Sequence, residues 1–251
     1  MEVLHAPAGT GKSFLVGALA EVWPTSGKPP YPEGEPDGGG DGPRVFGVAY
    51  GQRQADVLTE EGVTVRNIRK WLDGQARLDA GRPVPGDETF RLRRGDLLVV
   101  DEAGAAATPD LVAVHRRCAE IGAKLLLVGD TRQFAAVGAG GAMADLTERA
   151  LTYELAEVRR FRNDWEGSAW LRLRDGDTTI VDDYVKHGRL VDAGTVEQAE
   201  QTAARMWLAD TVDGRESLII VGSNAAAARL TSSAPNWSGW ERSRRPGCRS
   251  G

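Results

Sequence analysis

A glycine-rich turn near the start of the chain limits the possible folds more than any other feature of the sequence. The turn, Ala6–Ser13, reads APAGTGKS and follows the short apolar stretch Val3–Leu4. Gly9 and Gly11 let the backbone curl so that several N–H groups face one anion, and the helix that follows adds its positive N-terminal end. A strand, this turn and a helix in that order form the phosphate-loop pattern, which predicts an α/β fold that binds nucleotide phosphates.

The lysine and serine that close the turn predict two bound cofactors, ATP and Mg²⁺. Lys12 is expected to reach the β- and γ-phosphates, while the Ser13 hydroxyl holds Mg²⁺. Ala6 stands where the pattern usually has its first glycine. A glycine-rich turn arising by chance is the alternative, and the flanking strand and helix argue against it. The predicted cofactor-binding residues are Pro7, Ala8, Gly9, Thr10, Gly11, Lys12 and Ser13.

An apolar run that ends in two carboxylates is the second candidate part of the site. Leu97–Val100 is followed directly by Asp101 and Glu102. A continuous apolar run is typical of a strand buried on both faces of a parallel sheet, and its carboxyl end lies where α/β proteins bind ligands. Asp101 is therefore expected to hold Mg²⁺, and Glu102 to orient or deprotonate the attacking water.

A second buried run, Lys124–Val128, leads into the polar sequence GDTRQF at positions 129–134. Gln133 or Arg132 in this loop can contact the γ-phosphate of a nucleotide and report whether that phosphate is present. Taken alone, the loop is explained equally well as an ordinary polar connection.

Strand and helix patterns alternate through the first part of the chain, which indicates an α/β domain with a parallel sheet. Thr108 is expected to cap a helix whose first position is Pro109. The polar segment Gly81–Gly95 is expected to form a loop or a short hairpin. Further strands are predicted at 44–49 and 63–65, and further helices at 52–60 and 67–78.

A second unit follows the first in the sequence pattern. It is expected to begin with a helix from about Asp164 and to continue with a helix over Glu197–Ala209. Ser217–Val221 reads SLIIV, an apolar run that predicts a strand.

The three motifs occur together as APAGTGKS, VVDEAG and LLLVGDTRQFAAVGAGG. In this order they resemble superfamily 1 DNA helicases of the RecD-like branch, and most closely the helicase region of conjugal-transfer relaxases of the TraA/TraI type. The resemblance implies a RecA-like parallel sheet flanked by helices, followed by the beginning of a second RecA-like domain. It implies a motor that couples ATP hydrolysis to movement on single-stranded DNA.

The resemblance also implies roles for residues outside the three motifs. The sequence VAYGQRQA, at 48–55, resembles a DNA-contacting motif, and Thr64 resembles the next one. The sequence LAEVRRF, at 155–161, resembles a later helicase motif in which Arg160 contacts phosphate. The predicted catalytic residues are thus Lys12, Asp101, Glu102, Gln133 and Arg160, the metal ligands are Ser13 and Asp101, and the DNA contacts are Tyr50, Gln52, Arg53 and Thr64.

The extent of the resemblance predicts how the chain is divided. Residues 1–155 are expected to form the RecA-like ATP-binding domain, with a flexible Pro/Gly loop at 24–43, and residues 156–230 an incomplete second motor domain. The resemblance runs from about residue 2 to Leu230 and lacks motifs on both sides, so we expect a motor truncated at both ends. The irregular tail 231–251 is explained either as a basic DNA-binding tail or as sequence not native to this fold. Its lack of any packing period favours the second explanation.

Composition excludes several other classes of protein. The net charge of −5 argues against a chain that coats nucleic acid along its whole surface, so any DNA contact is expected in a local groove. No apolar run reaches the length of a membrane span, and Cys118 and Cys248 are too few for a disulfide framework. We therefore expect a cytoplasmic protein without a membrane, and the resemblance implies single-stranded DNA and other conjugation proteins as partners.

Three functions are compatible with the sequence. The first is the ATP-binding motor portion of a DNA helicase. The second is a catalytically incomplete remnant that binds nucleotide or DNA. The third is a small phosphate-loop kinase, against which stands the lack of an arginine-rich lid. Stimulation of ATP hydrolysis by single-stranded DNA separates the first from the third.

Overall fold

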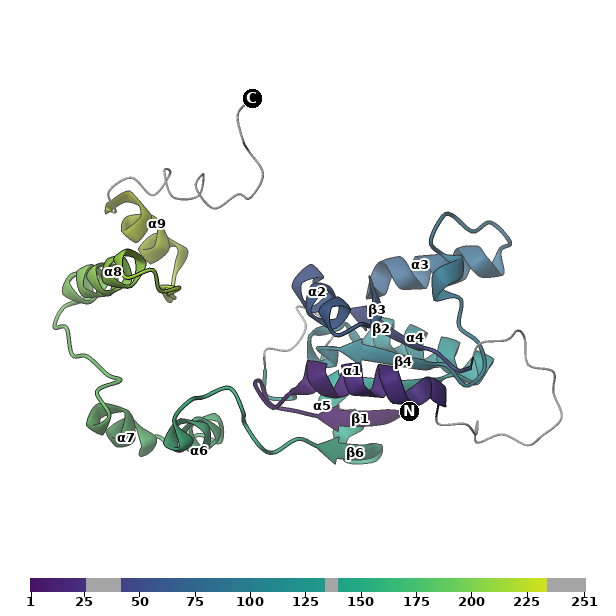
Figure 1. Cartoon of the computed structure of the whole chain (residues 1–251), viewed down its shortest axis with the longest axis horizontal. Coiled ribbons are helices and arrows are strands. Elements are labelled where there is room, and N and C mark those ends of the chain that lie inside the picture. Colours follow the sequence, from purple (N-terminus) through teal and green to yellow (C-terminus); the bar gives the residue numbers. More distant parts are fainter. Residues whose placement is uncertain (26–41, 134–139, 234–251) are drawn as a thin grey trace, which may run out of the picture. The chain divides into compact units, whose positions relative to one another are not determined.

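The computed structural model describes residues 1–25, 42–133 and 140–233 (Figure 1). The chain divides into two compact units, Met1–Thr178 and Thr179–Gly251. The predicted Pro/Gly loop at 24–43 lies outside the described residues except at its ends, and the tail 231–251 lies outside them after Ser233.

The first unit is built on a six-stranded sheet with strand order β3-β2-β4-β5-β1-β6. Every pair of neighbouring strands in it is parallel, so all the strands have their carboxyl ends at one edge. The predicted α/β fold with a parallel sheet flanked by helices is therefore confirmed. The strands are β1 (Glu2–His5), β2 (Val45–Ala49), β3 (Thr64–Asn67), β4 (Leu97–Asp101), β5 (Lys124–Gly129) and β6 (Leu151–Glu154).

Helices cover both faces of this sheet, as Figure 1 shows. Side chains of α1 and α2 pack in one core cluster, and those of α3, α4 and α5 in another. A sixth helix, α6, follows the last strand. The bounds are α1 (Lys12–Val22), α2 (Gln52–Glu60), α3 (Ile68–Asp79), α4 (Thr108–Ile121), α5 (Ala142–Arg149) and α6 (Asp164–Arg174).

Strand β4 shows why its sequence is continuously apolar. Leu98 and Val100 belong to the core cluster under α3 and α4, whereas Leu97 and Val99 belong to the cluster under α1 and α2. Successive side chains of a strand point to opposite faces, and here both faces are covered. The two-sided burial explains the apolar run and positions Asp101 at the carboxyl edge.

One local prediction in the first unit is corrected by the structure: Ala107, rather than Thr108, is the N-cap of α4, and Thr108 opens the helix. Of the two alternatives for the segment Gly81–Gly95, the structure shows the loop, which contains turns and the short 3₁₀ helix η2 (Glu88–Phe90). Asp87 holds this segment in place, because its buried carboxylate accepts hydrogen bonds from Arg66, Arg77 and the amide of Val84.

The second unit is helical in the part that the structure describes. It contains α7 (Ile180–Lys186), α8 (Val196–Val212) and α9 (Asn224–Ser233). The predicted strand at Ser217–Val221 is wrong: these residues are irregular, and Leu218 and Ile220 are 83% and 85% exposed. A strand needs a neighbour for its backbone groups, and residues 179–233 hold no other strand to supply one.

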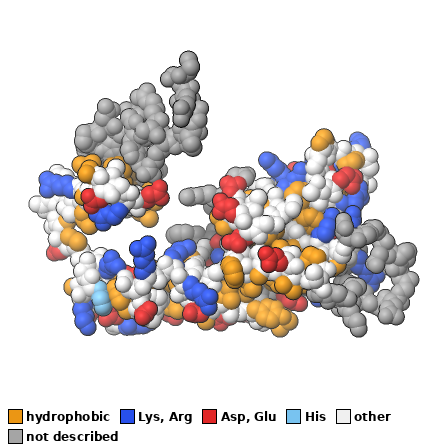
Figure 2. Space-filling model, viewed as in Figure 1, with side chains coloured by type: hydrophobic (Ala, Val, Ile, Leu, Met, Phe, Trp, Pro, Cys, Tyr) orange, Lys and Arg blue, Asp and Glu red, His pale blue; other side chains and the backbone are white. Residues whose placement is uncertain are grey.

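Apolar side chains remain on the surface of the second unit, where Figure 2 shows them beside charged ones. The exposed apolar residues of α8 are Val196, Met206, Leu208 and Val212. None of the helices in the described ranges is long and apolar enough to cross a membrane.

Candidate nucleotide-binding site

The phosphate loop connects β1 to α1 at the carboxyl edge of the sheet. Gly9 and Gly11 have φ angles of 84° and 90°, a region that side chains disfavour, and Gly11 is the N-cap of α1. The buried Thr10 hydroxyl donates to the carbonyl of Pro7 at 2.8 Å, which holds the turn closed. The loop thus brings the positive end of α1 to an open edge of the sheet, as the sequence pattern predicts.

Lys12 extends from the first turn of α1 to the end of β4. Its Nζ lies 2.8 Å from Oε1 of Glu102, and both side chains are largely shielded from water. Glu102 has a φ angle of 50°, making it the one non-glycine residue with positive φ in the described part of the chain. Such a conformation costs about 1–3 kcal/mol and is found mainly where a site requires it. The geometry brings the first two predicted motifs into direct contact.

Asp101 is the deeper of the two carboxylates at this edge. Its Oδ1 accepts a hydrogen bond from the backbone N–H of Glu102 at 2.9 Å. Burial, followed by the neighbouring charge of Glu102, raises the pKa of Asp101 above its ordinary value, and Lys12 only partly opposes them. A nearby cation would favour the charged form, so this carboxylate is suited to a metal ion.

The segment after β6 runs along the phosphate loop. Leu155 donates its N–H to the carbonyl of His5 at 3.0 Å, and Arg159 donates its N–H to the carbonyl of Gly9 at 2.9 Å. Arg160 lies directly over Gly9, since a Cβ added to that glycine would come within 2.6 Å of the Cβ of Arg160. The structure thus brings Arg160 to the phosphate loop, although 150 positions separate them in sequence.

Gln133 lies at the end of the turn that follows β5. Its N–H donates to the carbonyl of Asp130 at 3.3 Å, and its side chain is exposed. The structure therefore shows the third motif at the same edge of the sheet as Lys12 and Asp101, with the Gln133 side chain accessible.

The predicted DNA-contacting residues are only partly brought together. Tyr50 follows β2 at the carboxyl edge and is half exposed, but Thr64 pairs in register with Phe46 at the opposite end of β3. The side chains of Gln52 and Arg53 lie outside the described residues.

Asn67, which sequence reasoning missed, lies beside Tyr50. It donates from Nδ2 to the carbonyl of Tyr50 at 2.9 Å, and its Oδ1 caps α3 by accepting from Arg69 and Lys70. An asparagine just before a helix is an N-cap signal that could have found it.

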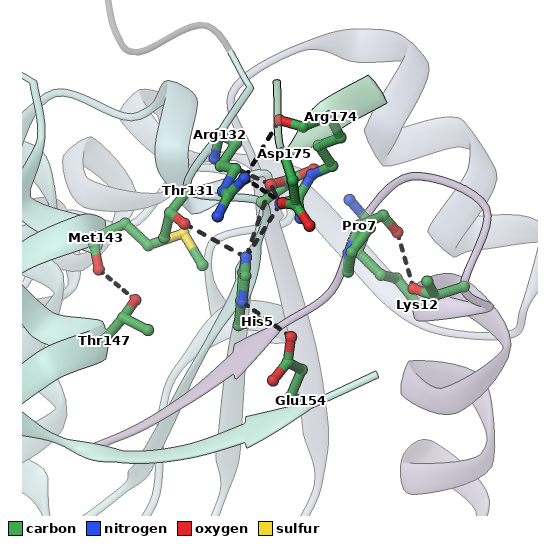
Figure 3. Close-up of polar contacts among 12 residues, drawn as sticks. His5, Pro7, Lys12, Thr131, Arg132, Met143, Thr147, Glu154, Arg174 and Asp175 are labelled. Atoms are coloured by element: carbon green, nitrogen blue, oxygen red, sulfur yellow. Dashed lines mark hydrogen bonds and ion pairs between the residues drawn. The ribbon is translucent and has the colours of Figure 1, made fainter. Parts of the chain in front are cut away.

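Three further residues, which are not among the predicted site residues, form a polar cluster beside the phosphate loop. They are His5, Asp130 and Arg174, and Figure 3 shows the His5 and Arg174 side chains close together near Thr131 and Arg132. Asp130 belongs to the GDTRQF sequence, whereas no local pattern marks Arg174, which comes from the end of α6.

Comparison with known proteins decides the family. Residues 1–195 match the family described as AAA domain. The chain belongs to this AAA domain family.

The relatives of this AAA domain are conjugal transfer proteins. A probable conjugal transfer protein TraA of Sinorhizobium fredii (strain NBRC 101917 / NGR234) is 28% identical over 215 residues, which are 85% of this chain and 17% of that protein. A conjugal transfer protein TraA of Agrobacterium fabrum (strain C58 / ATCC 33970) is 27% identical, with the same coverage of 85% and 17%. The predicted relationship to conjugal-transfer proteins of the TraA type is confirmed.

Among solved structures, the AAA domain is similar to a Pif1 helicase from Bacteroides in complex with ADP-AlF3 and ssDNA. The two share 13% sequence identity and a TM-score of 0.46, over 90% of this chain and 57% of that one. The chain spans about a sixth of the length of the TraA relatives it matches.

Proposed function

We propose that this chain is the ATP-binding portion of a DNA helicase motor, which couples hydrolysis of Mg-ATP to movement along single-stranded DNA in the cytoplasm. The observation that carries the proposal is the contact between Lys12 Nζ and Glu102 Oε1 at 2.8 Å. It joins the phosphate loop to the acidic end of β4, so both lie within reach of one phosphate group. Because the relatives are conjugal transfer proteins, we propose a conjugative relaxase-helicase as the setting and other conjugation proteins as partners.

The residues at this edge fit Mg-ATP. The Ser13 hydroxyl and the Asp101 carboxylate are hard oxygen ligands, and Mg²⁺ usually combines one or two such ligands with phosphate oxygens and water. Within residues 1–25, 42–133 and 140–233, no group of three or more His, Cys, Asp or Glu could hold a metal ion without help. Two protein ligands suit a metal ion whose other ligands are nucleotide phosphate oxygens and water. When bound, Mg-ATP supplies the phosphoryl group and neutralises part of its charge.

Lys12 and Glu102 change partners in this proposal. Lys12 turns from the Glu102 carboxylate to the β- and γ-phosphates, because these carry more negative charge than one carboxylate. Glu102, released from Lys12, orients the attacking water and accepts its proton. The ion pair with Lys12 therefore keeps the Glu102 carboxylate away from water activation until a nucleotide binds.

Two further groups act on the terminal phosphate. Arg160, held over Gly9 by the backbone hydrogen bond of Arg159, supplies positive charge to the phosphate loop. Gln133 reports from the neighbouring turn whether the γ-phosphate is present. For single-stranded DNA we propose contacts at Tyr50, Gln52 and Arg53, and Thr64 stays a prediction.

The test is ATP hydrolysis by residues 1–251 with and without an oligothymidine strand. We expect turnover that the strand stimulates, and loss of at least about a hundredfold in Lys12→Ala and Glu102→Gln, as is typical when a charge-stabilising or general-base group is removed. Glu102→Gln is expected to retain nucleotide binding. Lys124→Ala is the matched control, because Lys124 faces Glu2 at 3.9 Å at the amino edge of the same sheet.

Other outcomes select the competing functions. Binding of ATP without turnover would contradict the motor and support a nucleotide-binding remnant. Turnover that DNA does not stimulate would support a small phosphate-loop kinase. Full activity in both Lys12→Ala and Glu102→Gln would show that neither residue acts in ATP hydrolysis and would contradict the proposed site.

A further inference from the structure

A buried carboxylate, Asp130, joins the third motif to helix α6. Asp130 is 3% exposed. It accepts hydrogen bonds from the N–H of Arg132 at 3.0 Å and from the guanidinium of Arg174. Burial alone would raise the pKa of Asp130, but these two donors outweigh it and hold the pKa below its ordinary value. The carboxylate therefore stays charged in a buried place, with Arg174 as its counter-charge.

His5 ties the same pair to the start of the phosphate loop. Its Nε2 lies 3.3 Å from Arg174 Nη2 and 3.3 Å from the Thr131 hydroxyl, as Figure 3 shows. The same Nε2 lies 3.7 Å from Oδ1 of Asp130, so His5 contacts both members of the pair. Nδ1 faces the Glu154 carboxylate at 3.8 Å. His5 is the last residue of β1, and Ala6 begins the phosphate loop directly after it.

The segment before helix α6 and the carboxyl end of the helix both contact residues of the candidate nucleotide site. Before the helix, Arg159 donates to the carbonyl of Gly9, and the Phe161 and Trp170 rings pack 6.5 Å apart. After it, Arg132 Nη1 donates to the carbonyl of Arg174 at 3.2 Å and pairs with the carboxylate of Asp175. A shift of the helix would therefore move the loop that carries Gln133.

We propose that Arg174 is a positioning residue that acts through Asp130 to hold the 129–133 loop in the geometry that senses the terminal phosphate. The inference rests on the proposed ATP-binding function and on the role of Gln133 within it. Arg174 does not touch the nucleotide; it fixes the loop from which Gln133 reaches the γ-phosphate. The chain leaves the first unit four residues after Arg174, so the same contact links phosphate sensing to the segment that leads into the second unit.

The experiment measures nucleotide selectivity in residues 1–251. Dissociation constants are determined for ADP and for the non-hydrolysable analogue AMP-PNP, both with Mg²⁺. We expect wild type to prefer AMP-PNP, and Arg174→Ala to lose about tenfold of that preference while its affinity for ADP is unchanged, which is the usual effect of losing one hydrogen bond to a charged group. Arg174→Lys keeps the charge but not the planar fork, and is expected to regain only part of the preference.

The matched control is Arg172→Ala on the same helix. Arg172 pairs with Asp177 at 2.8 Å. Its removal is expected to leave selectivity unchanged. A double variant tests the route of action: Gln133→Ala with Arg174→Ala is expected to be no less selective than Gln133→Ala alone.

The measurements distinguish failure of the positioning role from failure of the proposed function. Selectivity retained in Arg174→Ala, or lost equally in Arg172→Ala, overturns the positioning role and leaves the proposed function standing. If Arg174→Ala does not fold, Arg174→Lys decides in its place, because it weakens the same contact with Asp130 and is expected to show a smaller loss in the same direction. Wild-type protein that binds no nucleotide would overturn the proposed function and this inference with it.

Discussion

The two units of the chain differ in how completely they bury their apolar side chains. In the first, alternate residues of β4 pack into two separate cores, and the side chains of Leu98 and Val99 are fully buried. In the second, Ile180 is fully buried, but the α8 side chains Met206 and Val212 lie exposed. A parallel sheet covered on both faces completes its own core, whereas the helices described in the second unit have no sheet to pack against and leave apolar surface open to water.

This difference indicates where the chemistry can reside. Every candidate nucleotide-site residue from Lys12 to Arg160 lies in the first unit, on a scaffold with its own core. Functional groups need rigid support from the elements that carry them, and among the residues that the structure describes the first unit provides it. We therefore propose that nucleotide binding resides in residues 1–178, and we expect the second unit to contribute little to it.

The largest expected contrast comes from shortening one leucine in each unit. Leu98→Ala should destabilise the protein by about 2–5 kcal/mol, because it leaves a cavity between packed layers. Leu218→Ala should change stability by less than about 0.5 kcal/mol, because that side chain is 83% exposed. Urea denaturation followed by circular dichroism measures both. Equal losses would mean that the second unit buries its apolar residues in solution.

A smaller contrast concerns two ion pairs and their response to acid. Hydrogen bonds from Arg77, then from the Val84 amide and Arg66, hold the pKa of Asp87 well below its ordinary value. A lowered carboxyl pKa stabilises the fold above the ordinary pKa of the unfolded chain, near 4, and this stability is lost as the pH falls below it. Asp87→Asn should therefore lower stability at pH 7 and flatten its decline between pH 5 and 3.

The second unit supplies the control for that titration. Glu200 pairs with the exposed Arg229 at 2.6 Å, and this hydrogen bond lowers the pKa of Glu200. Exposed pairs contribute little to stability. Glu200→Gln should leave the denaturation midpoint almost unchanged at every pH. The contrast fails if Asp87→Asn and wild type lose stability in parallel as the solution is acidified.

The features predicted correctly from sequence are those specified by neighbouring residues. The phosphate loop is determined by glycines and a Lys-Ser pair within eight positions, and the buried strands by short apolar runs. Their meeting at one edge follows from the parallel sheet. This is why the sequence could predict that Lys12 and Asp101 lie at the same edge of the sheet.

The features that the sequence could not predict depend on distant partners. Arg174 reaches Asp130 from 44 positions away, and no local pattern marks it. Ser217–Val221 has the composition of a strand, yet it stays irregular because the described part of the second unit offers no strand to pair with it. Edge strand β6 was missed because it is only four residues long, and its apolar residues Leu151 and Tyr153 lie exposed rather than in a core.

The most direct test of the central claim is a titration of ATP and Mg²⁺ into two proteins, the complete chain and residues 1–178, each beside its Lys12→Ala variant. If the first unit holds the whole binding site, the two dissociation constants agree within about threefold and Lys12→Ala weakens both at least about tenfold, as expected for the loss of a charge-assisted contact. Binding that disappears when residues 179–251 are removed, from a fragment that still unfolds cooperatively, would contradict the account.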